Sequence, residues 1–151
     1  MSTRSTTHFT DEGRTVAIIY RHSDGYPEGA GTDILRFLNE CGKLNDPRFT
    51  DPSYLAAKYV VFLADMFNHS FQRNSKGVLK EVRNKSKLEF LSVGVLMEDP
   101  MDIEYRYVID CGTLEDGKPK VTCYPVSCSY PENRWTQYDP VVIPEPEAVS
   151  S

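Results

Sequence analysis

Between residues 88 and 109, apolar side chains occur at every second position, and this alternation constrains the fold more than any other feature of the chain. A period of two is typical of a strand with one buried face. The alternating residues form two runs, separated by the turn-forming residues 98–100: Leu91, Val93, Val95 and Met97, then Ile103, Tyr105, Tyr107 and Ile109. A hairpin centred near Pro100 places both runs on one face. The sequence therefore predicts an antiparallel sheet that needs a covering layer.

A second turn, over residues 112–119, leads into residues 120–128 and completes the predicted meander. Folding the chain about the middle of this turn pairs three residues of the last strand, Thr122, Tyr124 and Val126, with Ile109, Tyr107 and Tyr105. Pro125 has no amide donor, so we expect this strand at an edge of the sheet. In this register Cys111 and Cys123 do not face each other, and no disulfide is expected.

Two segments with helical periodicity, residues 33–41 and residues 52–69, supply the covering layer. Thr32 is the predicted N-cap of the first helix, and Gly42 is its predicted C-terminal stop. The second helix begins with an aspartate followed by proline, which is a strong start signal. Its wide apolar stripe predicts that this helix carries much of the core.

A further strand is predicted before these helices, because residues 16–20 form an unbroken apolar run. The order is then β-α-α-β-β-β, although the sequence does not decide where the first strand pairs. It predicts an α+β fold, a two-layer sandwich with a mainly antiparallel sheet and both helices packed on one face. A chain of 151 residues predicts one domain. We expect that domain over residues 14–139, between a disordered polar leader, residues 1–13, and a disordered Pro/Glu/Ser tail, residues 140–151.

The formal net charge of −5 argues against general nucleic-acid binding, which requires clustered Lys and Arg. One basic patch stands out, because residues 73–87 hold six basic residues against a single Glu81. Such a patch is either a solvated face or a local cationic surface. The longest apolar run, residues 59–64, is far shorter than the ~20 residues that span a bilayer. With no secretory signal at the N-terminus, we expect a cytoplasmic protein without a membrane partner.

The loop of residues 21–32 combines charge, imidazole, glycine and aromatic side chains between a predicted strand and a predicted helix. In this layout, backbone amides and the helix dipole receive an anion. The candidate ligand-binding residues are Arg21, His22, Asp24, Tyr26, Gly29, Gly31 and Thr32. The loop lacks the patterns of a P-loop or a dinucleotide fingerprint. A purely structural turn, held by hydrogen bonds between Arg21 and Asp24, accounts for the same residues.

Two alternatives use other side chains. In the first, His22, Asp24 and Glu28 bind a divalent cation in a metal-dependent hydrolase. No nucleophile motif accompanies them, so we assign no catalytic residue and no cofactor, and we favour a binding protein. The second alternative is a module that inhibits a host protein through its C-terminal segment. Its candidate partner-binding residues are Tyr130, Arg134 and Trp135.

The stretch from Tyr20 to Gly31 resembles the opening of a group of small uncharacterised proteins from phages and prophage regions, in which a strand runs into an R-H-x-D-G-Y-P-x-G-x-G loop. The resemblance implies a phage or mobile-element origin and an intracellular location, and it brings no established activity with it. Together with the loop, it leads to the hypothesis that the protein sequesters a nucleotide or another small anion, such as a host defence signal. The oligomeric state stays undecided.

Overall fold

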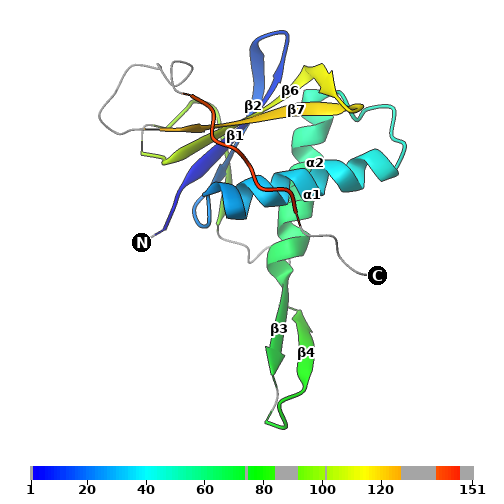
Figure 1. Cartoon of the computed structure of the whole chain (residues 1–151), viewed down its shortest axis with the longest axis vertical. Coiled ribbons are helices and arrows are strands. Elements are labelled where there is room, and N and C mark those ends of the chain that lie inside the picture. The colour runs from blue at the N-terminus through cyan, green and yellow to red at the C-terminus, as the bar shows by residue number, and fades with distance from the viewer. Residues whose placement is uncertain (1, 74, 84–91, 101, 127–138, 147–151) are drawn as a thin grey trace.

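The computed structural model describes residues 2–73, 75–83, 92–100, 102–126 and 139–146. Its centre is a five-stranded sheet in the order β5-β2-β1-β6-β7 (Figure 1). The strands are β1 (Ser5–Asp11), β2 (Arg14–Arg21), β5 (Val93–Leu96), β6 (Tyr105–Glu115) and β7 (Lys118–Pro125). A separate two-stranded ribbon consists of β3 (His69–Arg73) and β4 (Leu79–Arg83).

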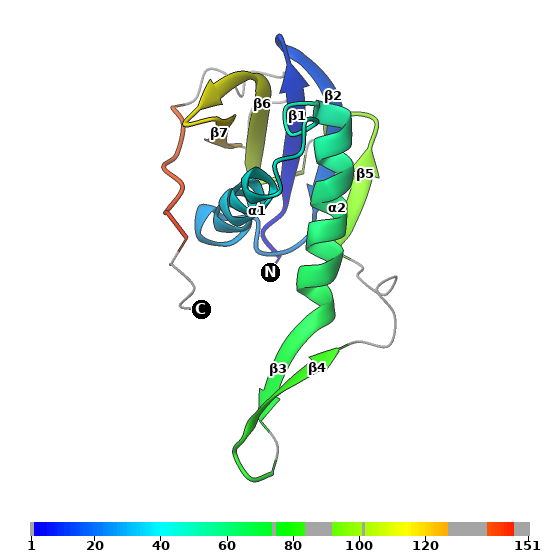
Figure 2. The ribbon, with the colours of Figure 1, turned by 90° about the vertical axis from the view of Figure 1, so that its right-hand side faces the viewer.

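Two helices, α1 (Thr32–Lys43) and α2 (Pro52–Asn68), pack on the five-stranded sheet, as the side view in Figure 2 shows. A short π-helix, η1 (Pro27–Gly31), precedes α1. The start signal of α2 is confirmed, because the Asp51 carboxylate accepts a hydrogen bond from the Ser53 amide at 3.2 Å. Gly42 lies inside α1 and does not end it. The predicted α+β class, with helices packed on a sheet, is confirmed.

The core lies between the two helices and the sheet. Tyr59 of α2 is 1% exposed, and its ring lies 5.1 Å from the ring of Phe37 and 5.7 Å from that of Phe9. These three aromatic rings join α2, α1 and β1. Around them pack further buried residues from both layers: Ile19, Ile34, Leu38, Leu55, Leu63, Tyr107, Ile109 and Cys123. No helix of the described residues is long and apolar enough to cross a membrane.

The predicted disordered leader is wrong for β1, which forms the middle strand of the sheet. β1 pairs antiparallel with β2 and parallel with β6, and all of its residues except Asp11 are buried. Its sequence, STTHFTD, shows no apolar alternation, so periodicity alone did not reveal a strand. Threonine nevertheless favours strands. The turn that follows has positive φ at Glu12 and Gly13, which is typical of a tight hairpin between β1 and β2.

The hairpin predicted at Pro100 is also wrong. β5 pairs with β2, and β6 pairs with β1, so two strands separate the segments that we expected to be neighbours. The run of residues 16–20 lies within β2, as predicted. Apolar alternation shows which face of a strand is buried, but it does not show which strand lies beside it.

The second hairpin, β6–β7, is confirmed, and β7 lies at an edge of the sheet as Pro125 indicates. Its register differs by one residue from the prediction, because Tyr107 pairs with Cys123 and Ile109 with Val121. The ladder is irregular between Asp110 and Leu114, a feature that a symmetric fold about the turn does not anticipate. As a result Cys123, rather than its neighbour Tyr124, joins the core.

Part of the predicted disordered tail lies against the sheet. The Val141 amide donates a 2.8 Å hydrogen bond to the Cys123 carbonyl, and Val141 and Ile143 pack against the core. The prediction of a disordered tail is therefore wrong for this part of residues 140–146. The partner-binding candidates Tyr130, Arg134 and Trp135 lie outside the described residues.

Candidate functional site

The loop of residues 21–32 connects β2 to α1, and its backbone is held by contacts within the protein. The Gly25 amide donates to the Thr3 carbonyl at 2.9 Å, and the Ala30 amide donates to the Asp24 carbonyl at 2.8 Å. The hydroxyl of Tyr107, from β6, donates to the Gly25 carbonyl at 2.7 Å. These bonds tie the loop to the N-terminal residues and to the sheet, so its backbone geometry is fixed before any partner binds.

Arg21, the expected anion ligand, is buried. Its Nη1 lies 2.7 Å from Oδ2 of Asp33, its Nε donates to the Ser23 carbonyl at 2.8 Å, and its guanidinium lies 5.1 Å from the Phe67 ring centroid. Only 4% of the residue is exposed. The expected hydrogen bonds between Arg21 and Asp24 are thus replaced by an ion pair with Asp33, the second residue of α1. A guanidinium in this position serves the fold and is not available to a ligand.

The loop glycines are required by close packing. A Cβ on Gly29 would lie 2.4 Å from the Asp24 carbonyl oxygen, and a Cβ on Gly25 would lie 2.8 Å from the Thr3 carbonyl oxygen. A Cβ on Gly31 would lie 2.9 Å from Cγ2 of Ile143. None of these glycines has positive φ; the left-handed residue of the loop is Asp24, with φ of 55°. Gly29 and Gly31 are therefore structural.

Thr32 is also engaged within the chain. It is the first residue of α1 and not its N-cap, because Gly31 occupies that position. Its hydroxyl donates to the Pro27 carbonyl at 3.2 Å. This hydrogen bond joins η1 to α1, so we assign Thr32 a structural role.

The exposed side chains of the loop are those of His22, Asp24, Tyr26 and Glu28. The Tyr26 hydroxyl donates to Oδ1 of Asp24 at 3.2 Å, and the negative charge of Asp24 raises the pKa of the Tyr26 phenol. Nδ1 of His22 lies 2.8 Å from the Tyr20 hydroxyl. We call these four side chains the loop surface. With two carboxylates and no arginine or lysine, it suits a cationic group better than a phosphate.

The ligand set of the hydrolase alternative is not brought together. Among the residues that the structure describes, no three or more His, Cys, Asp or Glu are grouped so that they could hold a metal ion. His22, Asp24 and Glu28 all belong to this part of the chain. The proximity of these residues in the sequence therefore does not produce a metal site.

The three described cysteines, Cys41, Cys111 and Cys123, are buried free thiols. Burial raises the pKa of Cys111 to about 12 and that of Cys123 to about 11. At neutral pH these thiols are protonated, and a protonated thiol is a poor nucleophile. They act as small core residues, without a disulfide between them.

Sequence reasoning missed a charged cluster in which His8 and Arg106 are buried and Asp99 is half-buried. It joins His8 of β1, Arg106 of β6 and Asp99 from the segment that follows β5; Nε2 of His8 lies 3.5 Å from Oδ1 of Asp99, and Nη2 of Arg106 contacts Oδ2. Burial opposes ionisation of Asp99, but the contacts with His8 and Arg106 outweigh it and lower its pKa. Burial lowers the pKa of Arg106, and the negative charge of Asp99 offsets only part of this lowering. A carboxylate stabilised in this way is a weak base, so the cluster is a structural link between strands.

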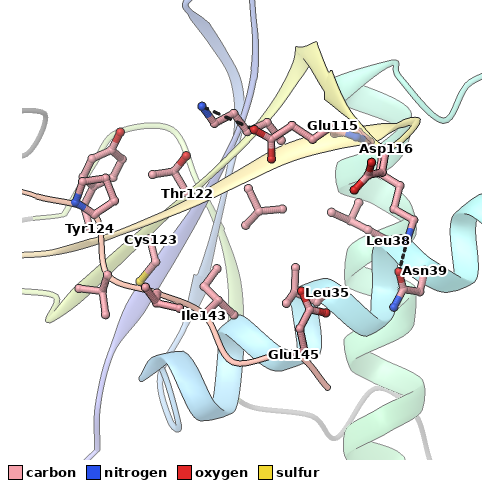
Figure 3. A pocket seen from close by; sticks show the side chains of 17 residues that line it. Leu35, Leu38, Asn39, Glu115, Asp116, Thr122, Cys123, Tyr124, Ile143 and Glu145 are labelled. Atoms are coloured by element: carbon pink, nitrogen blue, oxygen red, sulfur yellow. Dashed lines mark hydrogen bonds and ion pairs between the residues drawn. The ribbon is translucent and has the colours of Figure 1, made fainter. Parts of the chain in front are cut away.

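A hollow of about 520 Å³ lies between α1, β7 and the C-terminal segment. Figure 3 shows the side chains that line it. Its lining includes Leu38, Tyr124 and Ile143. Two lysines of the lining have partners there: Lys118 donates to Oδ1 of Asn39, and Lys120 lies 3.9 Å from Glu115. We do not assign this space a ligand.

Comparison of the chain with protein-family models, with curated proteins and with solved structures finds no match. The functional proposal below therefore depends on the geometry and charge of the molecule itself.

Proposed function

We propose that this protein is a binding protein whose loop surface, formed by His22, Asp24, Tyr26 and Glu28, recognises a basic segment of a partner protein. The observation that carries the proposal is the ion pair between Arg21 and Asp33, which removes the guanidinium of the loop from the surface. The two exposed carboxylates remain. A nucleotide at this surface would meet negative charge, so the proposal changes the expected ligand from an anion to a cation.

The composition of the loop surface supports an arginine or lysine side chain as the recognised group. A carboxylate forms charge-assisted hydrogen bonds with guanidinium and ammonium groups, and a tyrosine ring stacks on a guanidinium. Tyr26 is 38% exposed and lies beside Asp24, so both contacts are offered at one place. The fixed backbone of the loop lowers the conformational entropy lost on binding. With the phage-type resemblance of the loop, this arrangement favours a small protein that binds, and by binding inhibits, a host protein.

The test uses the full-length chain and fluorescently labelled 12-residue peptides that are rich in Arg, rich in Lys or rich in Glu, with ATP as the anionic probe. The variant Asp24→Asn/Glu28→Gln removes the two loop carboxylates, and asparagine tolerates the positive φ of position 24. We expect the Arg-rich peptide to bind best by fluorescence anisotropy, and the variant to bind it at least tenfold more weakly.

The matched control is Glu40→Gln/Asp116→Asn. It removes two exposed carboxylates outside the loop, and Asp116, like Asp24, has positive φ, at 53°. This control should bind the Arg-rich peptide as the wild type does. Equal weakening in both variants would mean that only net charge matters, and binding of ATP without binding of basic peptides would restore the anion hypothesis; either result contradicts the proposal.

A further inference from the structure

The β3–β4 ribbon is set apart from the rest of the fold. β3 begins at His69, directly after α2 ends at Asn68, and both views show the ribbon continuing beyond the end of α2, away from the five-stranded sheet (Figures 1 and 2). Its antiparallel register runs from the pair His69↔Arg83 to the pair Arg73↔Leu79. Residues 75–78, in the turn, are exposed. The ribbon is thus placed to reach a partner that the sheet and helices do not touch.

The ribbon concentrates positive charge on an acidic protein. From His69 to Arg83 the chain carries four basic residues, Arg73, Lys76, Lys80 and Arg83, against Glu81. Its formal charge is therefore +3, and because the whole chain carries −5, the residues outside the ribbon carry −8. A polyanion is attracted to the ribbon and repelled by the body, so charge directs it to one part of the molecule.

We infer that the β3–β4 ribbon is an arm that binds the phosphate backbone of double-stranded DNA, a function distinct from the peptide recognition proposed for the loop surface. The major groove of B-DNA is about 12 Å wide and admits a two-stranded β-ribbon. The major groove of A-form RNA is too deep and narrow for this contact. Duplex DNA therefore fits both the shape and the charge of the ribbon.

The basic residues are spread along the ribbon, from its α2 end to its turn. By register, Arg83 is at the α2 end of the ribbon, Lys80 pairs with Gln72, and Arg73 lies at the turn end. The first and last residue pairs of the ribbon are four residue steps apart along β3, which corresponds to ~13 Å at the rise of an antiparallel strand. Lys76 extends the series into the turn. Such a distribution neutralises phosphates along the duplex without reading base sequence.

The experiment measures binding of the full-length chain to a fluorescently labelled 20-bp duplex of arbitrary sequence, by anisotropy, across a salt series. If four cations each neutralise one phosphate, the slope of log K against log salt is roughly −3.6, and affinity falls roughly 150-fold between 50 and 200 mM salt. In the variant Arg73→Gln/Lys76→Gln/Lys80→Gln/Arg83→Gln, we expect at least a tenfold loss of affinity at 50 mM salt and a slope near zero.

The matched control replaces four exposed basic residues outside the ribbon, Arg14, Lys43, Arg48 and Lys120, by Gln. It changes the net charge by the same amount and should bind DNA within about threefold of the wild type. The single variant Lys76→Gln, in the exposed turn, guards against misfolding of the quadruple variant and should make the salt slope less steep by about 1. Circular dichroism melting confirms that each variant is folded.

Four results would overturn the inference. They are absence of duplex binding by the wild type at 50 mM salt, equal losses in the ribbon variant and the control, an unchanged slope in Lys76→Gln, and equal or tighter binding to a competitor. The competitors are a single DNA strand of the same sequence, an RNA duplex, and phosphatidylcholine vesicles with phosphatidylserine. Preference for the vesicles would identify a membrane surface as the partner, whereas preference for the single strand would exclude docking in a groove. The peptide experiment on the loop surface is unaffected by any of these outcomes.

Discussion

At the scale of single residues, Arg21 shows how burial changes the meaning of a side chain. Arg21 forms an ion pair with Asp33, and the two side chains are 5% and 11% exposed. We predict that Arg21→Ala lowers the free energy of unfolding by about 3 kcal/mol, because Asp33 loses its buried partner and keeps only the exposed Arg36, whose Nη1 lies 3.6 Å from Oδ1 of Asp33. Urea denaturation measures this loss. The double variant Arg21→Met/Asp33→Asn should lose less than the sum of the two single variants, since the unpaired charge is gone.

A loss below about 1 kcal/mol in Arg21→Ala would contradict this assignment and return Arg21 to the list of possible ligands. The sequence identified the right loop as an unusual feature, but it did not distinguish Arg21, which is buried, from His22, which is exposed. That distinction depends on Asp33 of α1 and Phe67 of α2, which reach Arg21 only through tertiary packing. Likewise, the glycines are explained by carbonyl groups and side chains that lie against them, and local sequence does not supply those neighbours.

At the scale of elements, both helices were predictable because their signals are local: apolar spacing, and an aspartate before the proline that begins α2. The strands were predictable only in part. β2, β6 and β7 have apolar positions that the sequence displays, whereas the middle strand β1 is polar and is stabilised by ladders on both sides. The pairing of β5 with β2 joins residues more than seventy positions apart. The apolar periodicity of a strand does not indicate which other strand it pairs with.

The place of β1 in the sheet leads to a prediction about hydrogen exchange. A disordered leader exchanges its amides at the rate of an unfolded chain, whereas a middle strand opens only with a large part of the fold. We expect the amides of residues 6–10 to be among the slowest in the protein, comparable with those of β6. NMR-detected exchange in D₂O measures both strands in one sample. The exposed amide of Gly117, in the β6–β7 turn, is the internal control and should exchange rapidly. Exchange of residues 6–10 as fast as that of Gly117 would contradict the sheet order.

At the scale of the whole molecule, the charged cluster of His8, Asp99 and Arg106 connects stability to pH. Through Asp99 it links the segment after β5 to β1 and β6, which are neighbouring strands in the middle of the sheet. Burial disfavours the charge of Asp99, but His8 and Arg106 outweigh burial, so its pKa in the folded protein lies below its ordinary value. A group of this kind stabilises the fold above its unfolded pKa, and the stabilisation is lost as pH falls through the folded pKa.

We therefore predict that the free energy of unfolding decreases as pH is lowered from about 5, near the upper end of the range in which an aspartate titrates. In Asp99→Asn, the protein should be less stable at pH 7, because the buried Arg106 loses its partner carboxylate, and its stability should change less between pH 5 and pH 3. Urea denaturation at each pH gives the two curves. Asp116→Asn, which removes an exposed carboxylate in the β6–β7 turn, should reproduce the wild-type curve. Parallel curves for the wild type and Asp99→Asn would show that the loss of stability in acid comes from carboxylates elsewhere in the chain and that Asp99 does not link the segment after β5 to the sheet.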